Sequence, residues 1–175
     1  MSNHAQTPRL WTPDGFKENA YLRVEALEDN AASERLLVTL ETFLAFEDAQ
    51  REEIISRIGV ELQPGEAVDA LLPHLARLPL IALAFPAYTD GRSYSKAQLL
   101  KERHGYQGEL RATGDVLLDQ VAHMLRVGFT SLEVTHQPTI ERLEKGDLAG
   151  IIHAYQPAAR SAAHSGGYSW RRLTG

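Results

Sequence analysis

The sequence has no cysteine among its 175 residues. This absence excludes disulfide bonds, catalysis by a thiol and iron–sulfur clusters that are ligated by cysteines of this chain. No apolar run reaches the roughly eighteen residues that a membrane-spanning helix needs. The first ten residues, MSNHAQTPRL, are polar, unlike a secretion signal. We therefore expect a soluble, cytoplasmic protein that does not bind membranes.

Several sequence motifs for cofactors and catalysis are also missing. No GxGxxG pattern follows an apolar run and no P-loop is present, so the fingerprints of dinucleotide and nucleotide sites are absent. The seven histidines show neither HExxH nor HxH spacing, and no GxSxG pattern indicates a nucleophilic serine. From these absences we expect no cofactor and no metal, although a metal site assembled from distant residues stays open. The net charge of −5 disfavours a nucleic-acid partner.

The chain does contain enough apolar sequence for a sizeable core, since 43% of its residues are hydrophobic. We expect an irregular N-terminal segment over residues 1–35, an α/β domain over residues 36–156 and a flexible C-terminal tail over residues 157–175. In the N-terminal segment, Trp11 and Phe16 are expected to pack on the domain from outside. Residues 21–26 are expected to form a short edge strand.

Apolar runs alternate with amphipathic stretches along the rest of the chain. The pattern predicts strands over residues 36–40, 60–62, 80–85, 109–112 and 129–134. It predicts helices over residues 41–58, 66–77, 95–104, 116–127, 138–145 and 148–155. This alternation indicates an α/β fold with a mainly parallel sheet of four or five strands and flanking helices. A flavodoxin-like arrangement and a partial (βα)n barrel both fit, because these patterns do not encode strand order.

The most informative stretch runs from Leu80 to Gln120. Its apolar run at 80–85 is followed by a polar turn at 88–92, and the strand at 109–112 runs into a second polar turn. In open parallel sheets, ligands bind beyond the carboxyl ends of the strands. We therefore expect the two turns to lie side by side and to form a candidate site with Asp90, Arg92, Arg111 and Asp115.

The charge of this stretch points to a small anion as the ligand. Residues 92–111 contain five lysines and arginines against two glutamates, a net charge of +3 in a chain that is acidic overall. The alternative is that Lys96, Lys101 and Arg103 form a solvated helix face. For Arg92 and Arg111, the separate alternative is structural pairing with Asp90 or Asp115.

Structural roles also compete with function for the polar residues of the turns. Asp115 has the position of a helix cap, and Asp90 belongs to an Asp-Gly turn. Ser95 and Gln98 have the spacing of a capping box, which predicts that a helix begins at Ser95. Gln120 lies near the apolar flank of its helix, where it can bond to neighbouring backbone.

The same stretch closely resembles a bacterial family of unknown function, DUF934. Its members read approximately FPxxTDGRGYS, then GELRAxGDVxxDQ and a GF step. The matching residues here are Phe85, Pro86, Thr89–Arg92, Tyr94–Ser95, Gly108–Ala112, Gly114–Val116, Asp119–Gln120 and Gly128–Phe129. Ser93 departs from the family, which usually has glycine at that position.

This resemblance, together with the turns, gives the set of candidate ligand-binding residues. They are Thr89, Asp90, Gly91, Arg92, Tyr94, Ser95, Arg111, Gly114, Asp115 and Gln120. The family is commonly described as an oxidoreductase involved in sulfite reduction, because its genes neighbour those of sulfite reductase and sulfate assimilation. That description assigns no chemistry to any residue.

The resemblance therefore implies a role in sulfur metabolism. Two hypotheses follow from it. The first is an accessory protein of assimilatory sulfite or sulfate reduction, which binds a small anion, sulfite reductase or another enzyme of sulfate assimilation. The second is a small enzyme that acts on an anionic substrate at the cluster of Asp90, Arg92, Arg111 and Asp115. If sulfite is reduced through a cysteine-ligated cluster, that cluster must belong to a partner, since this chain has no cysteine. A homodimer also fits either hypothesis.

Overall fold

The computed structural model is built around one eight-stranded sheet and describes residues 7–25 and 35–146. The predicted helix at 148–155 and the predicted tail at 157–175 lie outside these residues. The strands are β1 (Arg9–Thr12), β2 (Gly15–Lys17), β3 (Tyr21–Arg23), β4 (Arg35–Thr39), β5 (Ile58–Leu62), β6 (Leu80–Phe85), β7 (Glu109–Gly114) and β8 (Ser131–Val134).

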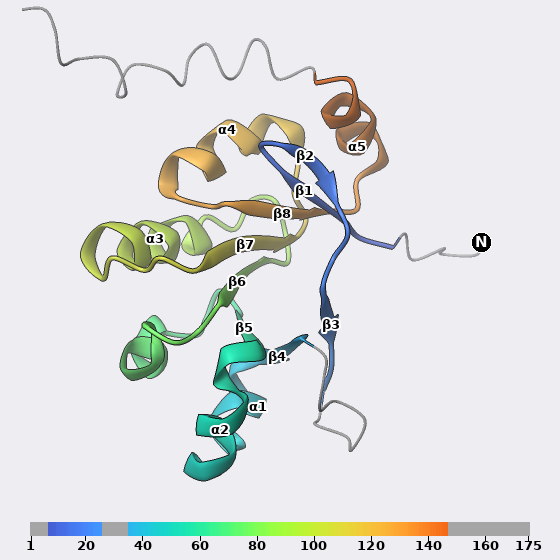
Figure 1. Cartoon of the computed structure of the whole chain (residues 1–175). Coiled ribbons are helices and arrows are strands. Elements are labelled where there is room, and N and C mark those ends of the chain that lie inside the picture. The colour runs from blue at the N-terminus through green and yellow to red at the C-terminus, as the bar shows by residue number, and fades with distance from the viewer. Residues whose placement is uncertain (1–6, 26–34, 147–175) are drawn as a thin grey trace, which may run out of the picture.

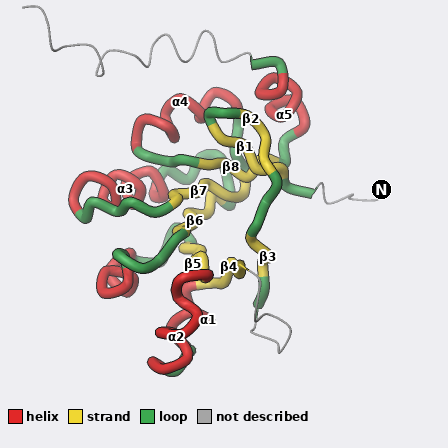
Figure 2. The backbone as a smooth tube through the Cα atoms, viewed as in Figure 1, coloured by secondary structure: helices red, strands yellow, loops and turns green. Residues whose placement is uncertain are grey.

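The six strands from β3 to β8 are parallel and lie next to one another in the order of the sequence. The hairpin of β1 and β2 extends this sheet, since β1 pairs antiparallel with β8. Successive right-handed crossovers between sequential strands place every helix on the same face of a sheet. The sheet is accordingly curled, and the helices follow its outer, convex side (Figure 1). Figure 2 shows the same arc of strands and the chain that leads from β2 to β3 across its open side.

The helical elements are short and vary in type. They are α1 (Leu40–Ala45), α2 (Asp48–Ile54), the 3-10 turns η2 (Ile55–Arg57) and η3 (Val68–His74), α3 (Arg92–Gln98), the π-helical turn η4 (Leu99–Arg103), α4 (Leu118–Val127) and α5 (Gln137–Glu144).

The α/β class is confirmed, but the predicted mainly parallel sheet of four or five strands is too small and lacks the antiparallel part. The sheet has eight strands and is mixed, because residues 9–17 add an antiparallel hairpin to one edge. Trp11 does not pack from outside; it lies within the core with 2% of its surface exposed. The edge strand predicted over residues 21–26 is present as β3 but is shorter, since it spans only Tyr21–Arg23. The sequential strand order is that of a partial barrel and differs from the flavodoxin order.

Several predicted helices also differ from those observed. The helix predicted over residues 41–58 is interrupted at Phe46 and Glu47, which both have extended backbone. The region 66–77 forms only the 3-10 turn η3, which contains Pro73, a residue that cannot donate a backbone hydrogen bond. The helix predicted to begin at Ser95 begins at Arg92 instead, so Ser95 lies inside α3 and does not cap it.

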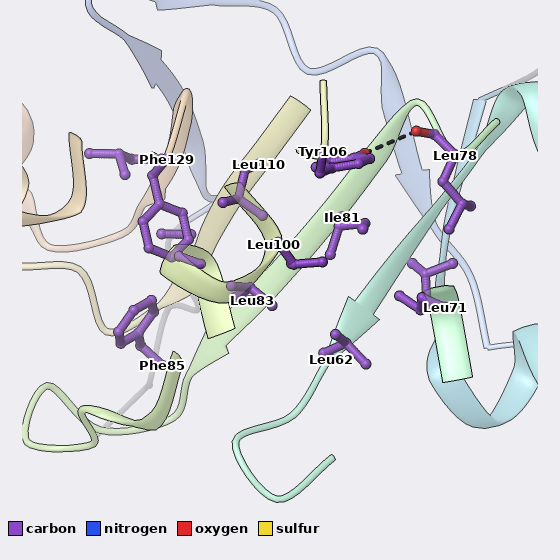
Figure 3. Packing of buried hydrophobic residues seen from close by; sticks show 14 of the residues in the cluster. Leu62, Leu71, Leu78, Ile81, Leu83, Phe85, Leu100, Tyr106, Leu110 and Phe129 are labelled. Carbon is purple, nitrogen blue, oxygen red and sulfur yellow. Dashed lines mark hydrogen bonds between the residues drawn. The ribbon is translucent and has the colours of Figure 1, made fainter. Parts of the chain in front are cut away.

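The main hydrophobic core lies between the convex side of the sheet and the helices. Alternate residues of each strand point into it, as the period of two in a strand requires. Figure 3 shows Ile81, Leu83 and Phe85 of β6 among side chains from the flanking elements. The hydroxyl of buried Tyr106 donates to the Leu78 carbonyl at 3.0 Å, which fixes the entry to β6. The other residues of each strand point to the concave side, where the polar groups gather.

Candidate functional site

The two predicted turns do lie side by side at the carboxyl edge of the sheet. Strands β6 and β7 pair in parallel, and the amide of Asp115 donates to the Phe85 carbonyl at 2.7 Å. The Asp115 carboxylate accepts the amide hydrogen of Tyr88 at 3.0 Å. Gln120 donates to the Tyr88 carbonyl at 2.8 Å and accepts from the Leu117 amide at 3.2 Å. Asp115 and Gln120 therefore hold the turns together, and Gln120 rather than Asp115 caps α4.

Asp90 and Arg92 form a local ion pair within the first turn. The Arg92 guanidinium donates to both carboxylate oxygens of Asp90, at 3.0 and 2.7 Å. The side-chain hydrogen bond from Arg92, followed by the bond from its backbone amide, lowers the pKa of Asp90 to about 2. The guanidinium in turn has a raised pKa because of Asp90. Arg92 is thus engaged by a carboxylate of its own turn.

The remaining predicted residues of the first turn are mostly structural. Tyr94 packs between Phe85 and His123, with ring-centroid distances of 5.0 and 4.5 Å. Burial, together with nearby Asp119, raises the pKa of the Tyr94 hydroxyl. Thr89 and Gly91 are exposed, and Gly91 directly precedes α3.

The basic residues between Arg92 and Arg111 do not converge on one site. Lys96 donates to the Gln63 carbonyl, and Lys101 donates to the carbonyls of Tyr106 and Gly108 at 3.0 and 3.2 Å. Burial lowers the pKa of both lysines. These contacts tie the two lysines to different loops of the fold.

The structure places Arg111 away from the turns, contrary to the prediction. Strand β7 continues to Gly114, so Arg111 lies in the middle of the strand, beside Ala82 and Ser131. Its side chain points to the concave side and is 1% exposed. The prediction failed because the ladder of backbone hydrogen bonds extends two residues further than the apolar pattern. The expected group of Asp90, Arg92, Arg111 and Asp115 is not assembled.

A network of charged and polar side chains occupies the concave side of β5, β7 and β8. Arg111 donates to Glu109 at 2.8 and 3.0 Å, to Glu133 at 3.0 Å and to Asn19 at 2.9 Å. Ser131 donates to Glu109 at 2.5 Å. Among the described residues no buried side-chain nitrogen or oxygen lacks a hydrogen-bond partner. Such full pairing is what keeps buried charge compatible with a stable fold.

Arg23 of the edge strand β3 closes this network from the opposite side. Its guanidinium forms ion pairs with Glu61 of β5 and with Glu133 of β8, the latter at 3.2 Å. Burial opposes the charged form of Arg23, but the two carboxylates outweigh it and raise its pKa. Thr113 of β7 donates to the other oxygen of Glu61 at 2.6 Å. Arg23 therefore bridges two carboxylates that are themselves held by the sheet.

This bridge lies at a cleft with a volume of about 450 Å³ at the carboxyl ends of β5 to β8, which we name the carboxyl-end cleft. Its apolar wall includes Phe85 and Pro86. Its polar lining consists of Arg23, Glu61, Gln63, Thr113, Asp115, Glu133 and Thr135. Of the predicted site residues, only Gly114 and Asp115 line it. The carboxyl ends of strands are where parallel sheets bind their ligands, so this cleft is the candidate site.

A larger pocket of about 810 Å³ lies at the opposite end of the strands. It contains Glu109 and Arg111, which bind each other, and Tyr21, whose ring lies 5.4 Å from the Arg111 guanidinium carbon. Burial raises the pKa of Tyr21. The position at the amino ends of the strands, remote from the turns, makes it the weaker candidate.

Sequence patterns missed Arg23, Glu61 and Glu133. A signal was nevertheless present, since Glu61 interrupts the apolar run IGVEL and Glu133 interrupts SLEV. A charge inside a buried strand needs a partner, and the partner of both is Arg23. The curl of the sheet, which brings β3 opposite β8, could not be predicted from the sequence.

Within residues 7–25 and 35–146, no three His, Asp or Glu side chains come together in a group that could hold a metal ion. In the same ranges, no helix combines the length and the apolar character needed to cross a membrane.

Comparison with known proteins gives one match. The sequence model of the family described as "Bacterial protein of unknown function (DUF934)" matches residues 59–165, which is more than half of the chain. The matched region begins at the second residue of β5 and includes β6 to β8 and α5, and it contains Glu61, Thr113 and Glu133 of the carboxyl-end cleft. The comparisons with curated proteins and with solved structures found no match.

Proposed function

The chain belongs to the DUF934 family, and on that premise we propose that it is an accessory protein of assimilatory sulfite or sulfate reduction that acts by binding. The pathway comes from the resemblance of its 85–129 segment to this family. The mode of action comes from the carboxyl-end cleft, where the half-exposed Arg23 covers the buried carboxylates of Glu61 and Glu133. This arrangement is the single observation that carries the proposal of a ligand site.

The charges of the first turn and of the carboxyl-end cleft indicate which kind of ligand can bind there. In the first turn Arg92 is paired with Asp90, and in the cleft three carboxylates face one arginine. Both surroundings disfavour sulfite or sulfate, because an incoming anion would meet an arginine that is already neutralised in the first turn and an excess of negative charge in the cleft. The geometry therefore supports a partner enzyme or a ligand that is not an anion more than it supports a small anion.

The alternative of an enzyme acting on an anionic substrate has weaker support. It requires Asp90, Arg92, Arg111 and Asp115 around one substrate, whereas Arg111 is buried in the network with Glu109 and Glu133. The absence of cysteine also means that a cysteine-ligated redox centre has to be supplied by the partner. Sulfite reductase, or another enzyme of sulfate assimilation, is the partner we propose.

The test combines growth with co-purification in a native host. Deletion of the gene should slow growth on sulfate and sulfite as sole sulfur sources but leave growth on cysteine unchanged. The wild-type gene should restore growth, and so should an Arg77→Ala control, which removes a surface pair with Glu52. A Glu61→Ala, Glu133→Ala double variant should fail to restore it.

Partner binding is tested in the same host on sulfate medium. A tagged chain should retain sulfite reductase, detected by its activity in the eluate, and the tagged Arg77→Ala control should retain it equally. Equal growth of the deletion strain on all three sulfur sources would remove the pathway from the proposal. If the double variant is expressed at the wild-type level and restores growth, the cleft is not required for the function and is removed from the proposal.

A further inference from the structure

The carboxylates of Glu61 and Glu133 each present one oxygen to the carboxyl-end cleft. Their Oε1 atoms are fixed from the sheet, that of Glu61 by Thr113 at 2.6 Å and that of Glu133 by Arg111 at 3.0 Å. Their Oε2 atoms both accept from Arg23, which occupies the space between them. Glu61 of β5 and Glu133 of β8 thus form a pair of fixed carboxylates, which we name the cradle. Its size and charge suit a guanidinium group.

We propose that the carboxyl-end cleft binds a small molecule through a guanidinium or primary ammonium group, and that Arg23 holds the place of this group in the free protein. The inference rests on the ligand site of the proposed function and names its ligand class; it does not rest on the pathway.

The charge of the cleft selects for a cation. Its charged lining residues are Glu61, Asp115 and Glu133 against Arg23 alone. If Arg23 leaves without a replacement, the carboxylate of Glu61, which is 7% exposed, loses its cationic partner, and that of Glu133 keeps only Arg111. That state is strongly disfavoured, because an unpaired charge at a buried position keeps its full desolvation cost. Exchange therefore requires that the entering group is itself positive.

Arg23 is the member of the network that is free to move. Its side chain is 49% exposed, compared with 1% for Arg111. It comes from β3, a strand of three residues at the edge of the sheet that pairs only with β4. An exposed arginine on an edge strand can rotate into solvent without breaking the core, whereas the carboxylates on β5 and β8 stay in place.

The cleft has room for the rest of a small ligand. Its volume of about 450 Å³ lies in the range of small-molecule sites. Phe85 and Pro86 offer an apolar wall, and Gln63 and Thr135 offer neutral polar groups at the rim. An alkylguanidine or alkylamine fits this description, with the charged end in the cradle and the alkyl chain on the apolar wall.

The test uses methylguanidinium as the probe and compares Arg23→Ala with Arg77→Ala. Arg77 forms the matched control, because it pairs with Glu52 at a similar exposure, 47%. At constant ionic strength, millimolar methylguanidinium should raise the melting temperature of Arg23→Ala but not that of Arg77→Ala. Sodium sulfate at the same ionic strength should not reproduce the effect.

Calorimetry then measures the affinity of agmatine for the wild-type chain and for Arg23→Ala. Removing the competing Arg23 side chain should tighten binding by at least about tenfold, if that side chain fills the cradle at least about nine-tenths of the time. Adding Glu61→Gln or Glu133→Gln to Arg23→Ala should abolish the binding. If Arg23→Ala does not fold, Arg23→Gln replaces it with a neutral side chain of similar length.

Equal responses of the two alanine variants to methylguanidinium would overturn the inference. Tighter binding of agmatine to wild type than to Arg23→Ala would overturn it as well. Because the growth assay reports on the pathway and these measurements report on the ligand, a failure here is distinguishable from a failure of the proposed function.

Discussion

The Arg111 guanidinium lies 3.0 Å from the Glu133 carboxylate, on the concave side of the sheet, where both side chains are almost completely buried. This contact joins the middle of β7 to β8 and links the candidate site to the interior. It also means that one of the two carboxylates in the cradle is positioned by a second, immobile arginine. The two arginines that contact Glu133 therefore have different roles, one structural and one exposed to the cleft.

The first prediction concerns the buried arginine. Arg111→Met should lower the free energy of unfolding by about 3–5 kcal/mol, because it leaves the carboxylates of Glu109 and Glu133 without their shared partner. Urea denaturation monitored by circular dichroism measures this loss. Arg77→Met, which breaks an exposed pair, should cost no more than about 1 kcal/mol. Similar losses for both variants would contradict a structural role for Arg111.

The second prediction concerns the pH response of the first turn. The pKa of Asp90 is lowered from its ordinary value of 3.8 to about 2 by hydrogen bonds from Arg92. The stabilisation linked to a lowered carboxyl pKa is complete above the unfolded value and is lost as the pH falls through the folded value. The Asp90 carboxyl signal in an NMR titration should therefore have its midpoint near pH 2.

Arg92→Ala supplies the control for this titration. Without the guanidinium, the midpoint should move up toward 3.8. An unchanged midpoint would show that the pair does not persist in solution.

The third prediction concerns the glycine at the end of β7. Gly114 has a φ of 92°, and a Cβ there would lie 2.4 Å from the Phe85 carbonyl oxygen. Gly114→Ala should therefore destabilise the fold by more than the roughly 1–3 kcal/mol that the backbone conformation alone costs. Gly91→Ala is the control, since Gly91 has a negative φ and open space around it. Thermal unfolding of the two variants should differ clearly, and equal melting temperatures would refute the close approach.

The sequence was sufficient to predict the central βαβα unit. Strand β6 matches the predicted residues 80–85, because its apolar run is bounded by Pro79 and Pro86 and buried on both faces. The adjacency of the two turns followed from the parallel connection, since both turns come after strands and precede helices. These features are local, so they can be read from a short stretch.

The features that could not be predicted depend on contacts between distant segments. Strands β1 and β2 have four and three residues, too few to show a clear alternation. The partners of Arg111 include Asn19, 92 positions away, so its place in a buried network has no local signature. Ser93 stands at a position where the DUF934 family usually has glycine. Its hydroxyl donates to the Ala84 carbonyl at 2.7 Å, and this contact accounts for the serine.

The pairing of β1 with β8 has a consequence for the order of events during synthesis. Leu10 and Trp11 are synthesised more than a hundred residues before their partners Glu133 and Leu132. The parallel strands can assemble one after another as they appear, since each pairs with the strand before it. The apolar residues of β1 cannot join the sheet until β8 has been synthesised. Closure by this hairpin is therefore a late step, and the nascent chain has to carry an exposed tryptophan until almost all of the described chain has been made.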